Sequence, residues 1–327
     1  MNETIALTAA TRTASAETEP AFPELVGRGP AMQALFAEMA RVTDSDVSVH
    51  VSGETGTGKE RVALAIHRRS RRGRGPFVAI NASSLSDELL EAEMFGHVKG
   101  AFTGAVAARE GYVAGAEGGT LFIDEVAELT PRGQAKLLRF VQEKEYRRVG
   151  EAETRRANVR VLSAANVDLE RRVAAGLFRE DLMYRLRPIV LALPPLRERG
   201  GDVLLLARHF LRLAAQREGV PAPLLPAEVV KALSSYAWPG NVRELENEMS
   251  RLVVLAGRGE VRREHLSARL GEAAADPRSC LRDARQRFER DFVGRALARN
   301  GGNRTRTACE LGLTRQALVA KIRRLGL

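Results

Sequence analysis

GETGTGKE, residues 53–60, is the stretch that decides the fold of this chain. It follows the run 47–51, which alternates like a β-strand, and it opens a helical pattern over residues 60–69. Its glycines let the backbone N–H groups face phosphate oxygens, while Lys59 and the positive end of the helix add charge. The alternative is a glycine-rich turn that binds nothing. The complete spacing G-x-x-x-x-G-K between a strand and a helix predicts a phosphate-binding loop.

A magnesium ion and an attacking water would need acidic side chains beside the phosphate-binding loop, and Asp124 and Glu125 are the candidates. Glu60 stands where the general form of this loop has Ser or Thr, so a bound magnesium ion must rely on water and on carboxylates elsewhere. GGTLFIDE, residues 118–125, is a buried-strand pattern that ends in Asp124 and Glu125. Such acids are often helix caps. Beside a phosphate-binding loop, however, the Asp can hold magnesium, directly or through water, and the Glu can orient the attacking water.

The composition indicates a chain with several domains and a polyanionic partner. Its 327 residues are enough for two or three domains, and its net charge is +10. Residues 279–327 hold twelve basic and four acidic residues, a net charge of +8. We therefore expect the polyanion to bind the C-terminal segment. The alternative is that these charges only form a solvated face. Cys280 and Cys309 make no disulfide framework or metal cluster, and the chain shows no signal peptide or membrane span. We therefore expect a cytoplasmic location.

Strand patterns alternate with helical patterns in the first 195 residues. This order predicts an α/β fold with a parallel sheet covered on both faces and a ligand at the carboxyl ends of the strands. Helical periodicity alone continues to about residue 270 and predicts a small lid, in which Trp238 is a core anchor. The expected divisions are a disordered tail (1–21), the α/β domain (22–195), the lid (196–271), a linker (272–278) and a C-terminal helical domain (279–327).

GHVKGAFTGA, residues 96–105, is a short run with three glycines, an aromatic residue and a threonine. Such a run cannot be a helix interior or a central strand. An exposed Phe102 at the tip of a mobile loop is costly unless it meets a partner. The alternative is a tight hairpin whose Phe102 side chain packs back into the core.

The C-terminal domain reads as a helix-turn-helix with a basic second helix. An amphipathic pattern over residues 280–299, with Leu281, Phe288, Phe292 and Leu297 apolar, ends at a glycine pair. Helices are expected over 304–311 and 314–325, the second capped by Thr314. We expect Arg315 and Gln316 to reach base edges, and the remaining basic side chains to meet phosphates: Arg304, Arg306, Lys321, Arg323 and Arg324.

From about residue 25 to its end, the chain resembles the AAA+ activators of sigma-54 RNA polymerase, also called bacterial enhancer-binding proteins. The phosphate-binding loop matches that family, Glu60 included, and EMFGHVKGAFTGA differs from the family's ELFGHEKGAFTGA at Val98 in particular. GAFTGA, residues 100–105, is the most specific motif because other AAA+ enzymes lack it. GGTLFIDE, FREDLMYRL, LPPLRER and WPGNVREL are also present, and the C-terminus resembles a Fis-type domain.

The resemblance implies ATP and magnesium as cofactors and a role for each matching residue. Lys59 would contact phosphates, Asp124 would serve magnesium, and Glu125 would position the water. Asn81 would hold Glu125 aside, Asn166 would sense the γ-phosphate, and Arg243 would be the sensor of the lid. Arg179 and Arg185 would act as arginine fingers in a neighbouring subunit, which implies a hexameric ring; the alternative is a surface ion pair with Glu180 or Asp181. The wider nucleotide-binding set is Val26, Gly27, Gly53, Glu54, Thr55, Gly56, Thr57, Gly58, Lys59, Glu60, Ala116, Glu117, Gly118 and Gly119.

The function implied is an ATP-hydrolysing transcriptional activator that binds double-stranded DNA upstream of a promoter and remodels sigma-54 RNA polymerase. Phe102 and Thr103 would grip sigma-54, within a contact segment formed by Gly100, Ala101, Phe102, Thr103, Gly104 and Ala105. One alternative is a DNA-binding regulator of the same fold that does not remodel sigma-54. Another is an AAA+ remodeller with a different target. About 21 residues precede Phe22, too few for a regulatory domain, so we expect control by a separate regulatory protein or by expression level.

Overall fold

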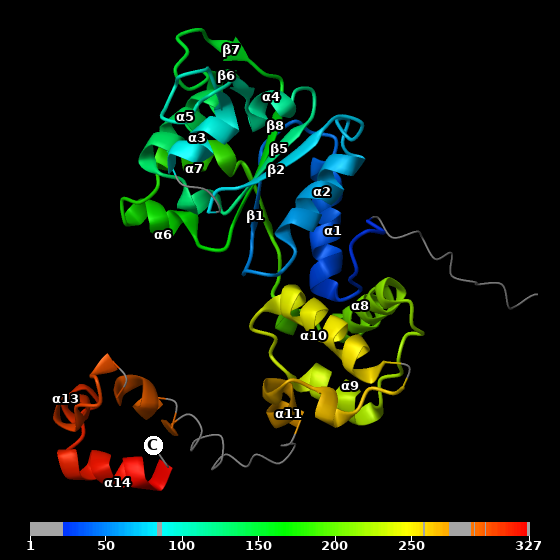
Figure 1. Ribbon diagram of the computed structural model, residues 1–327, viewed down its shortest axis with the longest axis vertical. Helices are drawn as coiled ribbons and strands as arrows, with labels where there is room; N and C mark the ends of the chain where they lie inside the picture. The colour runs from blue at the N-terminus through cyan, green and yellow to red at the C-terminus, as the bar shows by residue number, and fades with distance from the viewer. Residues whose placement is uncertain are drawn as a thin grey trace, which may run out of the picture. The chain divides into compact units, whose positions relative to one another are not determined.

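The computed structural model describes residues 22–83, 87–257, 259–274, 289–290, 292–297 and 299–325 (Figure 1). The chain divides into two compact units, one ending at Ser267 and the other starting at Ala268. The predicted disordered tail and Cys280 lie outside the described residues. None of the described helices is long and apolar enough to cross a membrane.

A five-stranded sheet forms the centre of the first unit. Its strands are β1 (Val49–Ser52), β2 (Phe77–Asn81), β5 (Thr120–Asp124), β8 (Arg160–Ala165) and β9 (Ile189–Ala192). The spatial order is β2-β5-β8-β1-β9, and every neighbouring pair is parallel. The predicted α/β fold with a parallel sheet is confirmed. Because the strands are parallel, the segments that follow them emerge at one edge, which is where the ligand was expected.

Helices cover both faces of this sheet (Figure 1). On one face, α1 (Pro30–Val42) and α2 (Lys59–Arg69) pack over side chains such as Phe122 and Leu162. On the other face, α3 (Asp87–Phe95), α5 (Pro131–Glu143) and α7 (Glu180–Leu186) pack over Leu121 and Ile123. Successive residues of a strand point to opposite faces, so one short apolar run supplies both cores.

Short elements connect these layers. Two antiparallel hairpins are formed by β3 (Gly96–His97) with β4 (Arg109–Glu110), and by β6 (Glu145–Tyr146) with β7 (Arg155–Arg156). The single-turn helix α4 (Tyr112–Gly115) precedes β5, the 3-10 turn η1 (Val126–Glu128) follows it, and α6 (Leu169–Ala174) follows β8. The first hairpin carries the GAFTGA segment between its two strands.

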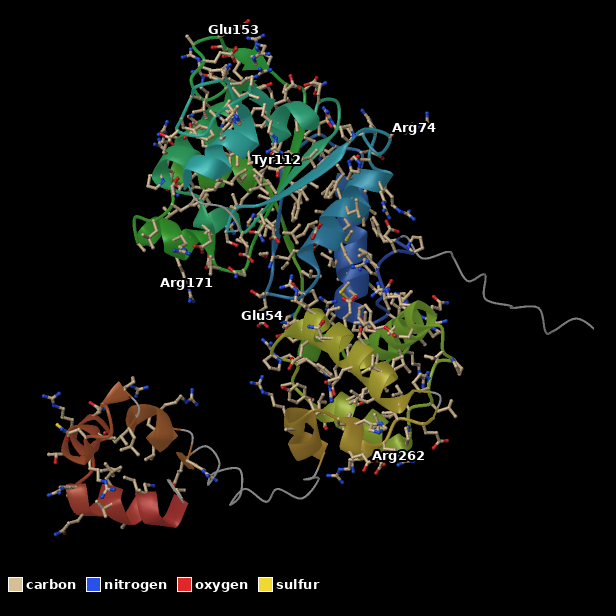
Figure 2. The ribbon with its side chains drawn as sticks, in the orientation of Figure 1. Glu54, Arg74, Tyr112, Glu153, Arg171 and Arg262 are labelled. Atoms are coloured by element: carbon tan, nitrogen blue, oxygen red, sulfur yellow. The ribbon has the colours of Figure 1, made fainter. Side chains whose placement is uncertain are left out.

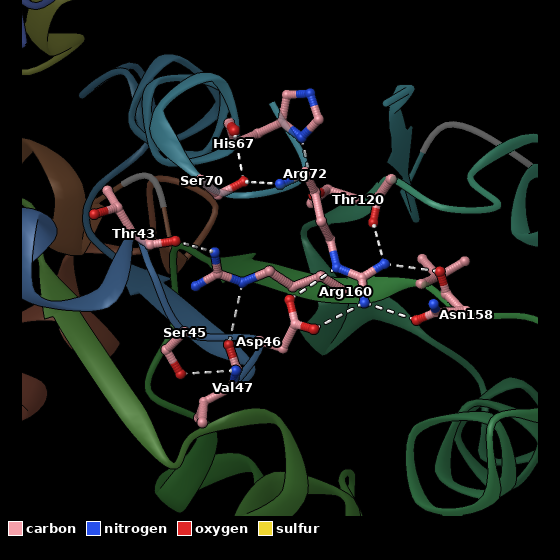
Figure 3. A network of polar contacts seen from close by, with 12 residues as sticks. Thr43, Ser45, Asp46, Val47, His67, Ser70, Arg72, Thr120, Asn158 and Arg160 are labelled. Carbon is pink, nitrogen blue, oxygen red and sulfur yellow. Dashed lines mark hydrogen bonds and ion pairs between the residues drawn. The ribbon is translucent and has the colours of Figure 1, made fainter. Parts of the chain in front are cut away.

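A polar network around Arg160 joins the sheet to the end of α1, at the edge of the sheet opposite the expected ligand (Figure 3). Arg160 is the first residue of β8 and only 1% exposed. Its guanidinium donates to the backbone carbonyls of Val42, Thr43 and Val47, at 2.8, 3.3 and 3.3 Å. Carbonyls at a helix C-terminus have no partner within the helix, so this cation caps the end of α1.

The lid consists of η2 (Leu196–Glu198), α8 (Asp202–Glu218), α9 (Ala227–Ser235), α10 (Asn241–Ala256) and η3 (Arg263–His265). Trp238, in the turn before α10, is fully buried, and its indole N–H donates to the Leu233 carbonyl at 2.9 Å. The expectation that Trp238 anchors the core of the lid is confirmed. Its φ of +51°, unusual for a bulky side chain, belongs to the sharp turn that starts α10.

The second unit contains α11 (Ala268–Ala274), α13 (Arg304–Glu310) and α14 (Arg315–Leu325), and its described residues 292–297 are also helical. Two expectations need correction. Residues 272–274, assigned to the linker, are helical, because the small residues that suggested a linker include alanines, which favour helices. Phe292 is 48% exposed, so the helix buries Val293 and Ala296 instead. The small core also holds Ala308, Leu318, Ile322 and Leu325.

Candidate nucleotide site

The glycine-rich loop connects β1 to α2 in the arrangement that the sequence predicts. Gly56 and Gly58 have φ angles of +78° and +102°, in the region where only glycine is free of strain. Gly58 caps α2, so Lys59 is the first helical residue, and the N–H groups of the first turn are available to an anion. The local geometry therefore presents a helix N-terminus and a curled backbone to the same space.

Lys59 lies within this loop and is 6% exposed. Its ammonium group donates to the carbonyls of Gly53 at 3.0 Å and Glu54 at 3.4 Å. The hydroxyl of Thr57 donates to the same Glu54 carbonyl at 2.7 Å. The cation is thus held at the mouth of the loop, within reach of a phosphate bound there.

Asp124 and Glu125 lie at the carboxyl end of β5. The carboxylate of Asp124 accepts the Glu125 N–H at 2.9 Å. Glu125 has a left-handed backbone, with φ of +52°, and its Oε2 is buried with no hydrogen-bond partner among the described residues. Burial raises the pKa of this carboxyl and Lys59 opposes the shift. An unsatisfied carboxylate in a strained backbone is typical of a group that acts on a substrate.

Two asparagines lie at the same edge. The side-chain N–H of Asn166, just after β8, donates to the Thr55 hydroxyl at 3.1 Å and so links the strand end to the phosphate loop. Asn81 ends β2, and its carbonyl oxygen accepts hydrogen bonds from the N–H and hydroxyl of Ser83. Asn81 pairs in register with Asp124, so the sheet itself places it beside the two acids.

These residues line a cavity of about 630 Å³. The phosphate loop, both acids, Asn81, Asn166 and Arg243 all contribute to its walls. The lining also includes residues that sequence reasoning missed: Leu25, Met32, Arg199, Leu206, His209 and Phe210. The aliphatic, aromatic and imidazole side chains among them suit a flat heterocyclic base. In the sequence, these apolar side chains resemble ordinary core residues. The only signal that could have found them is the amphipathic pattern of the helices that carry most of them.

Part of the predicted nucleotide-binding set lies outside the described lining of this cavity. Ala116, Glu117, Gly118 and Gly119 lie at the amino end of β5, whereas the cavity is at its carboxyl end beside Asp124. These four residues and the cavity are therefore at opposite ends of the same strand. Val26 lines the cavity, and Gly27 follows Val26 in the chain. Gly53 and Glu54 line a smaller pocket of about 340 Å³ behind the loop.

Arg179 and Arg185 lie outside the described lining of this cavity. Arg179, at the N-cap position of α7, forms a two-point ion pair with Asp181 at 3.0 and 2.8 Å, which is the alternative that the sequence left open. Arg185 is exposed on the last turn of α7. Any action of these arginines on a nucleotide would thus take place in another copy of the chain.

The GAFTGA segment folds back on itself. The N–H of Gly100 donates to the Ala105 carbonyl at 2.9 Å, while Thr103 and Gly104 are exposed. Phe102 is half-buried, with its ring edge-on to His97 at 5.0 Å. This corrects both expectations: Phe102 neither projects freely nor enters the main core, because the hairpin strand offers it a nearer aromatic partner.

The predicted DNA-binding residues of the second unit have different environments. Arg304, Arg306, Thr314, Arg315 and Gln316 are exposed, and the Thr314 hydroxyl accepts the Ala317 N–H at 3.2 Å, as expected for a cap. Lys321 is paired with Glu289 at 2.9 Å, so part of its charge is neutralised within the unit. Arg323 and Arg324 belong to α14, but their side chains are outside the described part.

Three known families match consecutive parts of the chain. The sigma-54 interaction domain matches residues 25–192, the AAA+ ATPase lid domain 197–280, and the Fis family of bacterial regulatory proteins 284–325. Together they cover the sheet domain, the lid and the helix-turn-helix.

Similar whole proteins are also known. The transcriptional regulatory protein ZraR of Klebsiella oxytoca is 44% identical over 99% of this chain and 74% of that protein. The DNA-binding transcriptional regulator NtrC of Salmonella typhimurium is 40% identical over 93% of this chain and 70% of that protein. The crystal structure of NtrX from Brucella abortus in complex with ATP has a TM-score of 0.73 and 34% identity, covering 93% of this chain and 70% of that one.

Proposed function

The chain belongs to the family of sigma-54-dependent transcriptional activators, and we propose that it hydrolyses ATP to remodel closed complexes of sigma-54 RNA polymerase. The observation that carries this proposal is that one folded unit holds both the GAFTGA hairpin and a cavity lined by the phosphate loop, Asp124 and Glu125. The ATP complex of the similar NtrX structure supports a nucleotide in the cavity.

Each group at the cavity has a task in hydrolysis. Lys59 and the N–H groups of the loop bind and orient the phosphates. Glu125 orients the attacking water and accepts its proton, which its strained position at the end of β5 favours. Asn166 reports the γ-phosphate to the loop through its bond to Thr55. Arg179 and Arg185 from a neighbouring subunit supply positive charge, worth on the order of 10³–10⁵ in rate.

The residues present fit a magnesium ion. Asp124 offers a carboxylate at the wall of the cavity, and magnesium typically binds one or two carboxylates with substrate phosphates and water. When bound, the ion would neutralise charge on the phosphates. Glu60 lines the same cavity and offers no hydroxyl, so the ion would rely on Asp124, water and the phosphates.

The other two parts of the chain direct this reaction. The exposed Thr103 and Gly104 form the tip that contacts sigma-54, and the hairpin holds that tip at a defined place. The exposed start of α14, Arg315 and Gln316, reads DNA upstream of the promoter. Copies of the chain assemble into a ring, which we take to be a hexamer, because the arginine fingers lie outside their own cavity.

The test is a native-gel shift of purified sigma-54 by this protein with ADP–aluminium fluoride, which stands in for the transferring γ-phosphate. We expect a shifted complex with the parent and none with Thr103→Ala, while both hydrolyse ATP equally. The exposed position of Thr103 means that its substitution leaves the core intact. Absence of a shift from an active parent ATPase would instead favour a regulator that binds DNA without remodelling sigma-54.

A further inference from the structure

Glu54 belongs to the phosphate loop, and Figure 2 shows it at the side of the sheet domain that meets the lid. It lines the smaller pocket behind the loop and not the nucleotide cavity. Its carboxylate forms a two-point ion pair with Arg197 of η2, at 2.8 and 2.5 Å. It also accepts the side-chain N–H of Asn241, at 3.1 Å. Arg197 first, and then Asn241, lower the pKa of Glu54 to about 2, so the carboxylate is charged throughout the neutral range.

Asn241 is the first residue of α10 and is fully buried. Its φ of +54° is a conformation that asparagine tolerates better than most residues. Its carbonyl oxygen accepts the Leu196 N–H at 2.8 Å, and its amide nitrogen also donates to the Thr55 carbonyl at 3.1 Å. One side chain thus joins the start of the lid, the start of α10 and the phosphate loop.

The backbones of the loop and α10 are also in direct contact. The N–H of Arg243, in the first turn of α10, donates to the Gly56 carbonyl at 3.1 Å and so satisfies a donor that the helix leaves free. A Cβ on Gly56 would lie 2.4 Å from the Gly240 carbonyl oxygen and 3.2 Å from the Cβ of Arg243. The side chain of Arg243 lines the nucleotide cavity from this position.

We propose that Glu54 and Asn241 are positioning residues that lock the first turn of α10 onto the phosphate loop and thereby place Arg243 at the nucleotide. The lid and the loop then move as one piece at this contact, and Arg243 acts on ATP only while the contact holds. This inference rests on the proposed function, because it requires ATP in the cavity. Glu54 needs no contact with the phosphates, since it acts through the lid.

The test is a double-mutant cycle between Glu54→Ala and Arg243→Ala, with the dissociation constants of a fluorescent ATP analogue and of ADP as readouts. If Glu54 acts by placing Arg243, each single change weakens ATP binding about 10-fold, and the double variant is no weaker than Arg243→Ala alone. Arg197→Ala should give the same pattern without altering the loop. Glu198→Gln is the matched control, because it removes an acid next to Arg197, at 3.9 Å, that does not bond to Asn241. We expect this variant to bind ATP as the parent does.

Thermal unfolding of each variant separates positioning from loss of folding. Independent effects, in which the double variant binds about 100-fold more weakly than the parent, would overturn the inference while leaving the ATPase proposal intact. A parent chain that binds no ATP would overturn the proposed function and this inference with it. An effect of Glu198→Gln equal to that of Glu54→Ala would also overturn the inference, because it would show a general response to lost charge.

Discussion

Lys59 is the residue whose loss we expect to weaken nucleotide binding most directly. Its ammonium group is held by two carbonyls of the loop, so replacing it by Ala removes the cation while the turn glycines stay in place. A hydrogen bond to a charged group contributes about 1.5–3 kcal/mol, so we expect the dissociation constant for ATP to rise at least about 10-fold. Equilibrium titration with a fluorescent analogue measures this. Lys231→Ala, at an exposed position of α9, should bind as the parent does.

We expect His50 to make the free energy of unfolding depend on pH. It is 2% exposed in β1, where burial, Arg187 and Lys59 lower its pKa from 6.5 to about 3. Between these values the unfolded chain binds a proton that the folded chain does not, so stability falls as pH decreases from 6.5 towards 3. The slope from this residue is at most about 1.4 kcal/mol per pH unit.

Urea unfolding of His50→Gln at pH 7 and pH 5.5 tests this assignment. The glutamine retains a polar group for the Ser163 hydroxyl, which lies 2.9 Å from the His50 ring nitrogen. We expect the variant to lose less stability than the parent over this pH range. Equal losses in the two proteins would mean that other groups account for the acid sensitivity.

At the scale of elements, Arg160 holds α1 to the sheet. Arg160→Met leaves three backbone carbonyls without their donor in a buried place, and we expect the free energy of unfolding to fall by about 2–4 kcal/mol. Urea unfolding measures this change. Arg156→Met is the control: its side chain is 80% exposed, and its surface ion pair with Glu145 contributes less than about 1 kcal/mol. A loss no larger than that of the control would show that α1 is held by its apolar face alone.

The second helix of the helix-turn-helix separates sequence reading from attraction to phosphate. Arg315, exposed at the start of α14, is expected to reach a base edge, so Arg315→Ala should cost about 1–3 kcal/mol on the preferred site and little on other DNA. Arg304→Ala should weaken binding to all sequences and reduce the salt slope by about one. Binding to specific and random duplexes at several salt concentrations distinguishes the two. The same loss on both duplexes for Arg315→Ala would place it on a phosphate.

The sequence predicted most of the elements because their signals are local. The glycine spacing before Lys59, the cap at Thr314 and the apolar alternation of 118–125 each specify structure within a few residues, and the Thr314 side chain does accept the Ala317 N–H. The base-facing wall of the cavity could not be predicted in this way. His209 and Phe210 lie on a helix whose apolar face shows that it is buried, but not against which partner.

At the scale of the whole molecule, proximity along the chain does not predict proximity in space. Gly118 and Gly119 are close to Asp124 in sequence, yet a strand separates them in space. Asn241 and Glu54 are 187 residues apart, yet they share a hydrogen bond. Contacts of this kind depend on how the lid docks on the sheet, and no periodicity within either segment encodes that docking.

A ring with shared sites predicts that two inactive variants complement each other. Lys59→Ala lacks a competent cavity but keeps its arginine fingers, and Arg185→Ala has the opposite defect. In a mixed ring, a cavity of the second variant can receive Arg185 from a neighbour of the first, so an equal mixture should regain about a quarter of the parental ATPase rate. Mixing the purified proteins and measuring ATP hydrolysis tests this, with Tyr184→Phe, an exposed position on the same helix, as an active control. Activity no higher than that of the separate variants would mean that Arg185 does not act on a neighbouring subunit.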